Sequence, residues 1–162
     1  MTAPLKHSPL AANALRQTLS KFATGVCVVT AAGKTGPVGI TINSFASVSM
    51  DPPLVLWSIK KDAGRREVFE TAKHCAIHIL HEGQRDLCNA FVKQADAFDE
   101  TNHMLNEFGV PVLKDCLARL DCQLSRVIDG GDHLIFLLDV KAVDAGTDAP
   151  LVFYDSGFRA LG

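Results

Sequence analysis

Residues 41–53 of the chain read Thr-Ile-Asn-Ser-Phe-Ala-Ser-Val-Ser-Met-Asp-Pro-Pro and lie between two apolar runs. Runs of this kind, bounded by turn residues, predict two strands. The connection is unusual for a plain turn, because small hydroxyl and amide side chains alternate with Phe45 and Val48. Small polar residues let a ligand approach the backbone and provide donors and acceptors without bulk. We interpret the segment either as a polar surface loop or as a binding loop for a flat, heteroatom-rich ligand.

Length and composition limit the possible classes of protein. The 162 residues fit one domain, which we expect to cover residues 1–162 with a flexible tail at 1–8. The net charge of -2, without a dense basic stripe, argues against a nucleic acid partner. The apolar runs are too short to span a bilayer and no secretory signal is evident, so we expect a cytoplasmic protein without a membrane segment. The five cysteines are odd in number and lack a Cys-x-x-Cys pair, which favours free, buried thiols.

The order of elements favours an antiparallel architecture. Helices are expected from Ser8-Pro9 onward, at 67–72 and at 82–92. Strands are expected at 26–31, 37–42, 54–59, 76–80, 118–124, 132–143 and 151–154. Most of these strands are joined as hairpins, which predicts a barrel with attached helices rather than a parallel sheet. The polar stretch 93–110 is long for a connection, which favours a binding loop or lid.

One basic segment follows the third expected strand. Residues 60–66 contain four cations, namely Lys60, Lys61, Arg65 and Arg66, and lead into a short predicted helix. Cations beside a helix N-terminus oppose the helix macrodipole. A bound phosphate would reverse that penalty, because helix-start N–H groups and Arg both favour an anion. The segment is therefore either a phosphate site or a solvated run of charge.

Two groups of histidines are further candidates. His74, His78 and His81 would share one face of a helix, but the apolar run around them predicts a strand, so we expect no metal site. His133 follows Gly131-Asp132 at a hairpin bend, where it would be a donor at the mouth of a barrel or would bond a neighbouring carbonyl. No G-x-S-x-G elbow, Walker P-loop or G-x-G-x-x-G fingerprint is present.

From about Leu15 to Gly162, the order and spacing of several blocks resemble the short-chain flavin reductase family. Its members are the reductase components of two-component flavin monooxygenases. The blocks that carry the resemblance are Thr41–Leu54, Phe69–Leu80, Gly109–Leu113, Leu117–Cys122, Gly131–Phe136 and Pro150–Tyr154.

The resemblance implies a fold and an activity. The implied fold is mainly β, an FMN-binding split β-barrel with antiparallel, Greek-key-like strands and flanking helices, assembled as a homodimer. The implied activity is that of an NAD(P)H:flavin oxidoreductase, which transfers hydride from NADH or NADPH to FMN or FAD and supplies reduced flavin to a partner monooxygenase. Two alternatives stay open: a flavin-binding module without turnover, and a flavoprotein reductase of another acceptor, such as a corrinoid or a ferric chelate.

The resemblance also implies site residues. Those implied to lie near the isoalloxazine and ribityl chain are Thr41, Ile42, Asn43, Ser44, Ala46, Ser47, Val48, Ser49, Trp57 and Ser58. Those implied to reach the phosphate are Lys60, Arg65 and Arg66. Asp132 and His133 correspond to the nicotinamide-contacting motif, with His133 in a positioning role, and Tyr154 and Phe158 to aromatic residues near the same pocket. Many relatives have Ser and Thr where this chain has Ala63, Gly64 and Arg65, so the phosphate contacts and the choice between FMN and FAD stay open.

Overall fold

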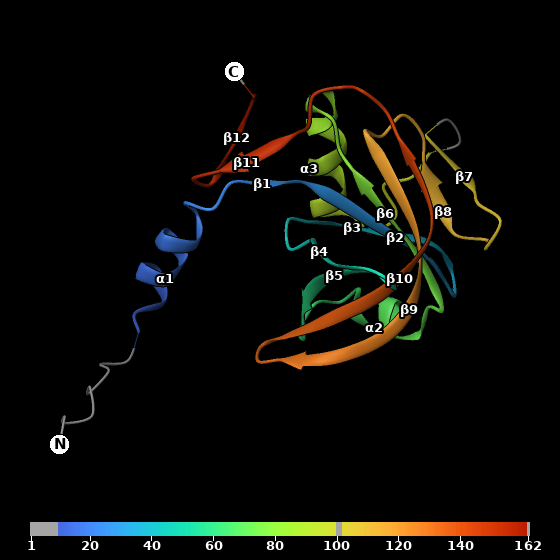
Figure 1. Cartoon of the computed structure of the whole chain (residues 1–162), viewed down its shortest axis with the longest axis horizontal. Coiled ribbons are helices and arrows are strands. Elements are labelled where there is room, and N and C mark those ends of the chain that lie inside the picture. Colours follow the sequence, from blue (N-terminus) through green and yellow to red (C-terminus); the bar gives the residue numbers. More distant parts are fainter. Residues whose placement is uncertain (1–9, 100–101, 162) are drawn as a thin grey trace.

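The computed structural model describes residues 10–99 and 102–161 (Figure 1). The predicted tail at 1–8 and the helix start at Ser8-Pro9 lie outside the described residues. No helix in the described part of the chain is long and apolar enough to cross a bilayer.

A seven-stranded sheet forms the body of the molecule, and all its neighbouring strands pair antiparallel. In spatial order the strands are β3 (Gly36–Ile42), β2 (Cys27–Gly33), β6 (His74–Ile79), β9 (Ala118–Gly130), β10 (His133–Ala145), β5 (Pro53–Lys60) and β4 (Ala46–Met50). This confirms the predicted antiparallel, mainly β class. However, β3 and β4 are the two edges and do not pair with each other, so hydrogen bonds do not close the sheet into the expected barrel.

The local geometry of Ser44 explains where the β4 ladder ends. Ala46 pairs with Leu56, so continued pairing would place Ser44 opposite Ser58. Instead the Ser44 hydroxyl bonds both the N–H and the carbonyl of Ser58, each at 3.0 Å. The side chain thus occupies the position that the backbone of a continued strand would take. The chain leaves the sheet between β3 and β4 at this point.

Residues 46–49 form a strand rather than the loop expected from their small polar side chains. They lie in β4, which pairs with β5 across the turn at 51–52 and leaves Val48 exposed. Serine has little intrinsic preference for strands, but the neighbouring β5 provides a ladder of backbone partners. Pairing with β5 therefore overrides the local composition.

The remaining elements surround this sheet. The helices are α1 (Ala12–Leu19), α2 (Arg66–Thr71), the short 3-10 helix η1 (Glu82–Gln84) and α3 (Arg85–Lys93). Two small sheets consist of β1 (Thr24–Gly25), β11 (Val152–Tyr154) and β12 (Gly157–Arg159), and of β7 (His103–Leu105) and β8 (Pro111–Leu113). In Figure 1, α1 stands apart from the body, and none of its residues is buried.

The core lies against the inner face of the large sheet. Trp57 of β5 is fully buried, stacked on Phe136 at 4.7 Å between ring centroids and edge-on to Phe69 at 5.0 Å. A second apolar cluster, which includes Val28 and Phe91, joins α3 to β2. All five cysteines are free, and four of them are buried, as expected for thiols that act as small apolar side chains.

No described residue of the segment 93–110 lines the two hollows beside residues 40–44, so the structure gives no support to the predicted binding loop or lid. The segment leads through β7 to β8, which packs against β2 and β6. Thr30 of β2 donates to the carbonyl of Pro111 at 2.5 Å, and the Leu113 N–H donates to Nε2 of His78 at 3.0 Å. Strand β8, with β7 paired to it, is therefore part of the structural support behind the sheet.

The histidines that suggested a metal site are separated in the structure. His78 lies in β6, fully buried, and its Nδ1 is 3.0 Å from the carbonyl of Val28. Since Nε2 accepts from Leu113, Nδ1 carries the proton and both ring nitrogens are engaged. His81 lies beyond the strand and caps η1. The described residues contain no group of three His, Cys, Asp or Glu side chains that could hold a metal ion.

Candidate functional site

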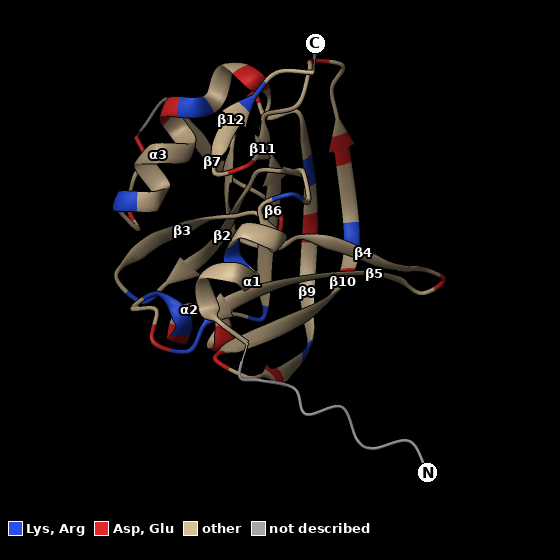
Figure 2. Cartoon of the chain, turned by 90° about the vertical axis from the view of Figure 1, so that its left-hand side faces the viewer, with Lys and Arg blue, Asp and Glu red and all other residues tan. Residues whose placement is uncertain are grey.

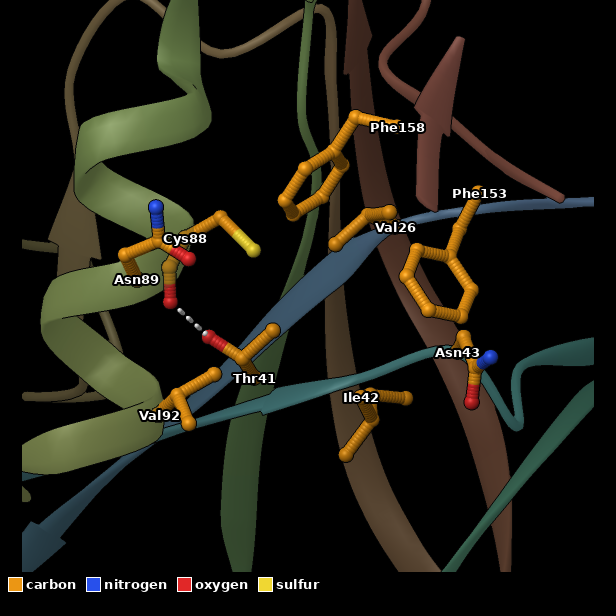
Figure 3. Close-up of a pocket in the computed structure, with 9 residues that line it drawn as sticks. All are labelled: Val26, Thr41, Ile42, Asn43, Cys88, Asn89, Val92, Phe153 and Phe158. Atoms are coloured by element: carbon orange, nitrogen blue, oxygen red, sulfur yellow. Dashed lines mark hydrogen bonds between the residues drawn. The ribbon is translucent and has the colours of Figure 1, made fainter. Parts of the chain in front are cut away.

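Two adjacent hollows lie beside the segment that links β3 to β4. The first has a volume of about 300 Å³ and is lined by Ile40, Thr41, Ile42, Asn43, Ser44, Ser58, Ile59, Lys60, Ala63 and His133. The second, of about 360 Å³, is lined by Val26, Thr41, Ile42, Asn43, Cys88, Asn89, Val92, Phe153 and Phe158 (Figure 3). Because both share Thr41, Ile42 and Asn43, we treat them together and call them the groove.

The strand register brings distant parts of the chain to the first hollow. His133, the first residue of β10, pairs with Lys60, the last residue of β5. Ser58 lies two residues earlier on β5, on the same face as Lys60, because side chains alternate along a strand. The end of this strand pair therefore places a cation, an imidazole and a hydroxyl group opposite the segment 40–44.

The charged groups at this end differ in how far they are engaged. Figure 2 shows basic residues beside α2. Lys60 is exposed, and its ammonium group forms no hydrogen bond or ion pair with any residue that the structure describes, although its charge helps to lower the pKa of the Asp132 carboxyl group. Nδ1 of His133 lies 2.6 Å from Oδ1 of Asp132, and this hydrogen bond lowers the pKa of the Asp132 carboxyl group. Asp132 thus orients the imidazole, while the Lys60 ammonium group remains free to bind an anion.

The second hollow combines aromatic rings with amide groups. Phe153 and Phe158 are contributed by the β11–β12 hairpin and meet edge to face at 5.6 Å. The side chains of Asn43 and Asn89 make no hydrogen bond within the described part of the chain and border the hollow (Figure 3). Thr41, in contrast, donates its hydroxyl proton to the carbonyl of Cys88 at 2.7 Å and so attaches β3 to α3.

The structure brings together about half of the residues expected from the resemblance. The expected residues that line the groove are Thr41, Ile42, Asn43, Ser44, Ser58, Lys60, His133 and Phe158. Those that do not line it are Ala46, Ser47, Val48, Ser49, Trp57, Arg65, Arg66, Asp132 and Tyr154. Trp57 is the clearest departure, because it belongs to the core and alternates with Ser58 along β5.

The two arginines of the basic segment are already bonded to protein groups. Arg66 donates to the carbonyl of Lys61 at 2.6 Å and pairs with Glu70 at 2.8 Å. The guanidinium group of Arg65 donates to backbone carbonyls, and its partial burial lowers its pKa. Neither side chain lines the groove.

Several lining residues were missed by reasoning from the sequence. The residues that had not been expected are Val26, Ile40, Ile59, Ala63, Cys88, Asn89, Val92 and Phe153. Those on α3 and β11 reach the groove only through tertiary packing. Ala63 and Ile59 could have been found, because they are neighbours of Lys60 and Ser58 in the same segment.

Comparison with known proteins identifies the family. A family model described as "Flavin reductase like domain" matches residues 19–162, which is nearly the whole chain. The chain belongs to the flavin reductase-like family.

Individual relatives agree with this assignment. "FMN reductase (NADH) SmoA" of Agrobacterium fabrum is 44% identical over 143 residues, covering 88% of this chain and 82% of the relative. The reductase component of the flavin-dependent trigonelline monooxygenase of Acinetobacter baylyi is 38% identical over 89% of this chain, which spans only 47% of that relative. The NADH:FAD oxidoreductase SgcE6 of Streptomyces globisporus has a solved structure that superposes with a TM-score of 0.88 at 33% identity, covering 96% of this chain and 98% of SgcE6.

Proposed function

We propose that this member of the family transfers hydride from NADH to FMN or FAD and supplies the reduced flavin to a partner monooxygenase. The observation that supports this most directly is the groove between segment 40–44 and the paired ends of β5 and β10. It places an unpaired cation and an oriented imidazole at one end, and an apolar, aromatic hollow at the other. This distribution suits a flat ring system that carries an anionic tail.

The groups lining the groove fit a flavin. The exposed Lys60 ammonium group forms no hydrogen bond or ion pair with the described residues, so a phosphate would gain a charge-assisted hydrogen bond without displacing another. The amides of Asn43 and Asn89 offer donors and acceptors that no other described side chain uses. Apolar contacts to a ring would come from Ile42 and Phe158.

The chain's own residues bind and orient rather than exchange protons. A bound flavin and a nicotinamide nucleotide would together supply the hydride chemistry. His133, oriented by Asp132, would position the nicotinamide end over the groove, which gives it a positioning role. Donors from Asn43 and the nearby backbone would stabilise negative charge that develops on the ring.

We also propose a homodimer in the cytoplasm. The short helix α1 exposes Leu15 and Leu19 at 42% and 61%, and Phe22, three residues beyond its end, is 77% exposed. An eight-residue helix gains most of its stability from packing. These exposed apolar side chains would be buried if the helix packed against a second copy of the chain. Leu19→Glu should shift the mass measured by sedimentation equilibrium from dimer to monomer. A wild-type monomer would contradict the proposal.

The proposed activity is tested by mixing purified protein with NADH and catalytic amounts of FMN, FAD or riboflavin under air. The expected result is a fast loss of nicotinamide absorbance that depends on both protein and added flavin. Replacing NADH with NADPH then ranks the two donors. Flavin binding without NADH oxidation in any combination would reject the reductase and leave a flavin-binding module.

A further inference from the structure

We propose that Arg65 is a positioning residue that holds three walls of the groove together, and that it does not contact the flavin phosphate. This inference rests on the proposed function, because it assumes that the groove binds a flavin. It changes the role expected for one cation of the basic segment, and it gives Lys60 the phosphate contact.

The guanidinium group of Arg65 joins three backbone carbonyls from two elements. Its Nη1 donates to the carbonyl of Gly39 at 3.0 Å and to that of Phe91, and its Nη2 reaches the carbonyl of Val92 at 3.4 Å. Phe91 and Val92 lie in the last turn of α3, where carbonyls have no partner inside the helix. A cation is favoured there by both hydrogen bonding and the macrodipole.

Gly39 is the point where α3 rests on β3. A Cβ atom at Gly39 would lie 2.5 Å from the ring of Phe91, so only glycine permits this approach. The Gly39 N–H also donates to the carbonyl of Ala95 at 2.8 Å, beyond the end of α3. The contact between β3 and α3 is therefore held both by packing of the Phe91 ring on Gly39 and by the hydrogen bonds of Arg65.

The three segments joined by Arg65 are walls of the groove. The segment after β5 contributes Ala63, strand β3 contributes Ile40 and Ile42, and α3 contributes Asn89 and Val92. A change in the distance between these segments would alter the width of both hollows. Arg65 thus acts on ligand binding through the walls, without lining either hollow itself.

Release of Arg65 toward a phosphate would leave several carbonyls without partners. Each carbonyl would lose a charge-assisted hydrogen bond, and unpaired carbonyls near a buried contact are costly. Lys60 is exposed and lines the groove, and its ammonium group forms no hydrogen bond with the described residues. The phosphate contact therefore falls to Lys60 and the positioning role to Arg65.

The comparison of FMN with riboflavin separates the two roles, because riboflavin has the same ring and ribityl chain but no phosphate. We would measure the dissociation constants of both by isothermal titration calorimetry for the wild type, Arg65→Met and Lys60→Met. Arg65→Met should weaken both ligands by the same factor, about tenfold. Lys60→Met should weaken FMN about tenfold and riboflavin less than about twofold, with the FMN effect shrinking at high salt.

Two further measurements keep the test decisive. If Arg65→Met does not fold, as judged by circular dichroism, Arg65→Lys retains a cation that can reach fewer carbonyls, and both ligands should weaken equally by a smaller factor. A selective loss of FMN in either Arg65 variant would overturn the proposal. Unchanged dissociation constants with a lower melting temperature would also overturn it, since Arg65 would then be purely structural. Failure of the wild type to bind any flavin would instead reject the proposed function.

Discussion

His78 and His133 lie on the same sheet, but the two imidazole groups differ in burial and in how many hydrogen bonds they form. Behind the sheet, His78 is fully buried and both of its ring nitrogens bond backbone groups of β2 and β8. At the groove, the side chain of His133 is 37% exposed and bonds only its neighbour Asp132 among the described residues. One region uses its hydrogen-bonding capacity for the fold, whereas the other leaves capacity for a ligand.

The same contrast extends to the neighbouring residues. Behind the sheet, Thr30 donates to Pro111, and the amide of Asn106 donates to Asp121 at 3.0 Å. At the groove, the side chains of Lys60 and Asn43 form no hydrogen bond in the part of the chain that the structure describes. Unpaired polar groups that line a hollow are therefore a better guide to function here than residue type alone.

The largest expected effect is a loss of protein stability when the buried His78 is replaced. His78→Ala removes partners from the Val28 carbonyl and the Leu113 N–H and leaves a cavity, so we expect a loss of about 4 kcal/mol in the free energy of unfolding. Denaturant titration measures this loss. His133→Ala is the matched control and should change stability by less than about 0.5 kcal/mol. Similar losses in the two variants would remove the contrast between the regions.

The next effect is a pH dependence that originates behind the sheet. Burial lowers the pKa of His78 to about 4, from an ordinary value of 6.5. The unfolded chain therefore binds more protons between these values, and the free energy of unfolding should fall by about 3 kcal/mol as the pH drops through this window. Denaturant titrations from pH 7.5 down to 4 measure the slope. An equally steep slope in a folded His78→Gln variant would assign it to other groups.

At the groove, the expected effect is on ligand use rather than on stability. His133→Ala should raise the Michaelis constant for NADH about tenfold and change the dissociation constant of FMN less than about twofold. Steady-state kinetics and calorimetry measure these quantities. Unchanged kinetics with NADH would show that His133 does not position the nicotinamide nucleotide.

The smallest effect should come from an exposed ion pair near His133. Lys61 bonds Asp129 at 2.5 Å, with side chains 37% and 74% exposed, and this contact lowers the pKa of the Asp129 carboxyl group. Solvent screens such pairs, so Lys61→Met should leave stability nearly unchanged. Any rise in the Michaelis constant for NADH should disappear in high salt. A salt-independent rise would indicate a direct contact with the nucleotide.

Much of the sheet could be predicted because most of its strands show apolar runs or apolar–polar alternation bounded by turn residues. The alternation at 118–124 and the turn at Gly130-Gly131 indicate the β9–β10 hairpin, although β9 continues to Gly130, well beyond the predicted residues. Strand β4 was missed, since its serines resemble a loop and only pairing with β5 makes it a strand. At the end of β4, the Ser44 hydroxyl group bonds the backbone of Ser58 in place of a strand partner, which periodicity does not reveal.

Residues of the candidate site could be predicted only where they lie at the ends of strands that the sequence pattern indicates. Segment 41–44, Lys60 and His133 lie at strand ends that the hairpin pattern indicates, and the structure brings them together. Trp57 could have been assigned to the core, because alternation places it opposite Ser58. The role of Arg65 could not, since its carbonyl partners lie on β3 and α3, far from it in sequence.

The burial of Trp57 has an optical consequence. It is the only tryptophan in the chain, and its indole N–H is buried without a hydrogen-bond partner in the described structure. A dry indole stacked on Phe136 should emit at short wavelength, and its emission should shift to the red when the core opens to water. The next residue, Ser58, lines the groove, so a bound flavin would lie within range for resonance energy transfer from the indole. One intrinsic fluorophore would thus report both the integrity of the core and the occupancy of the groove.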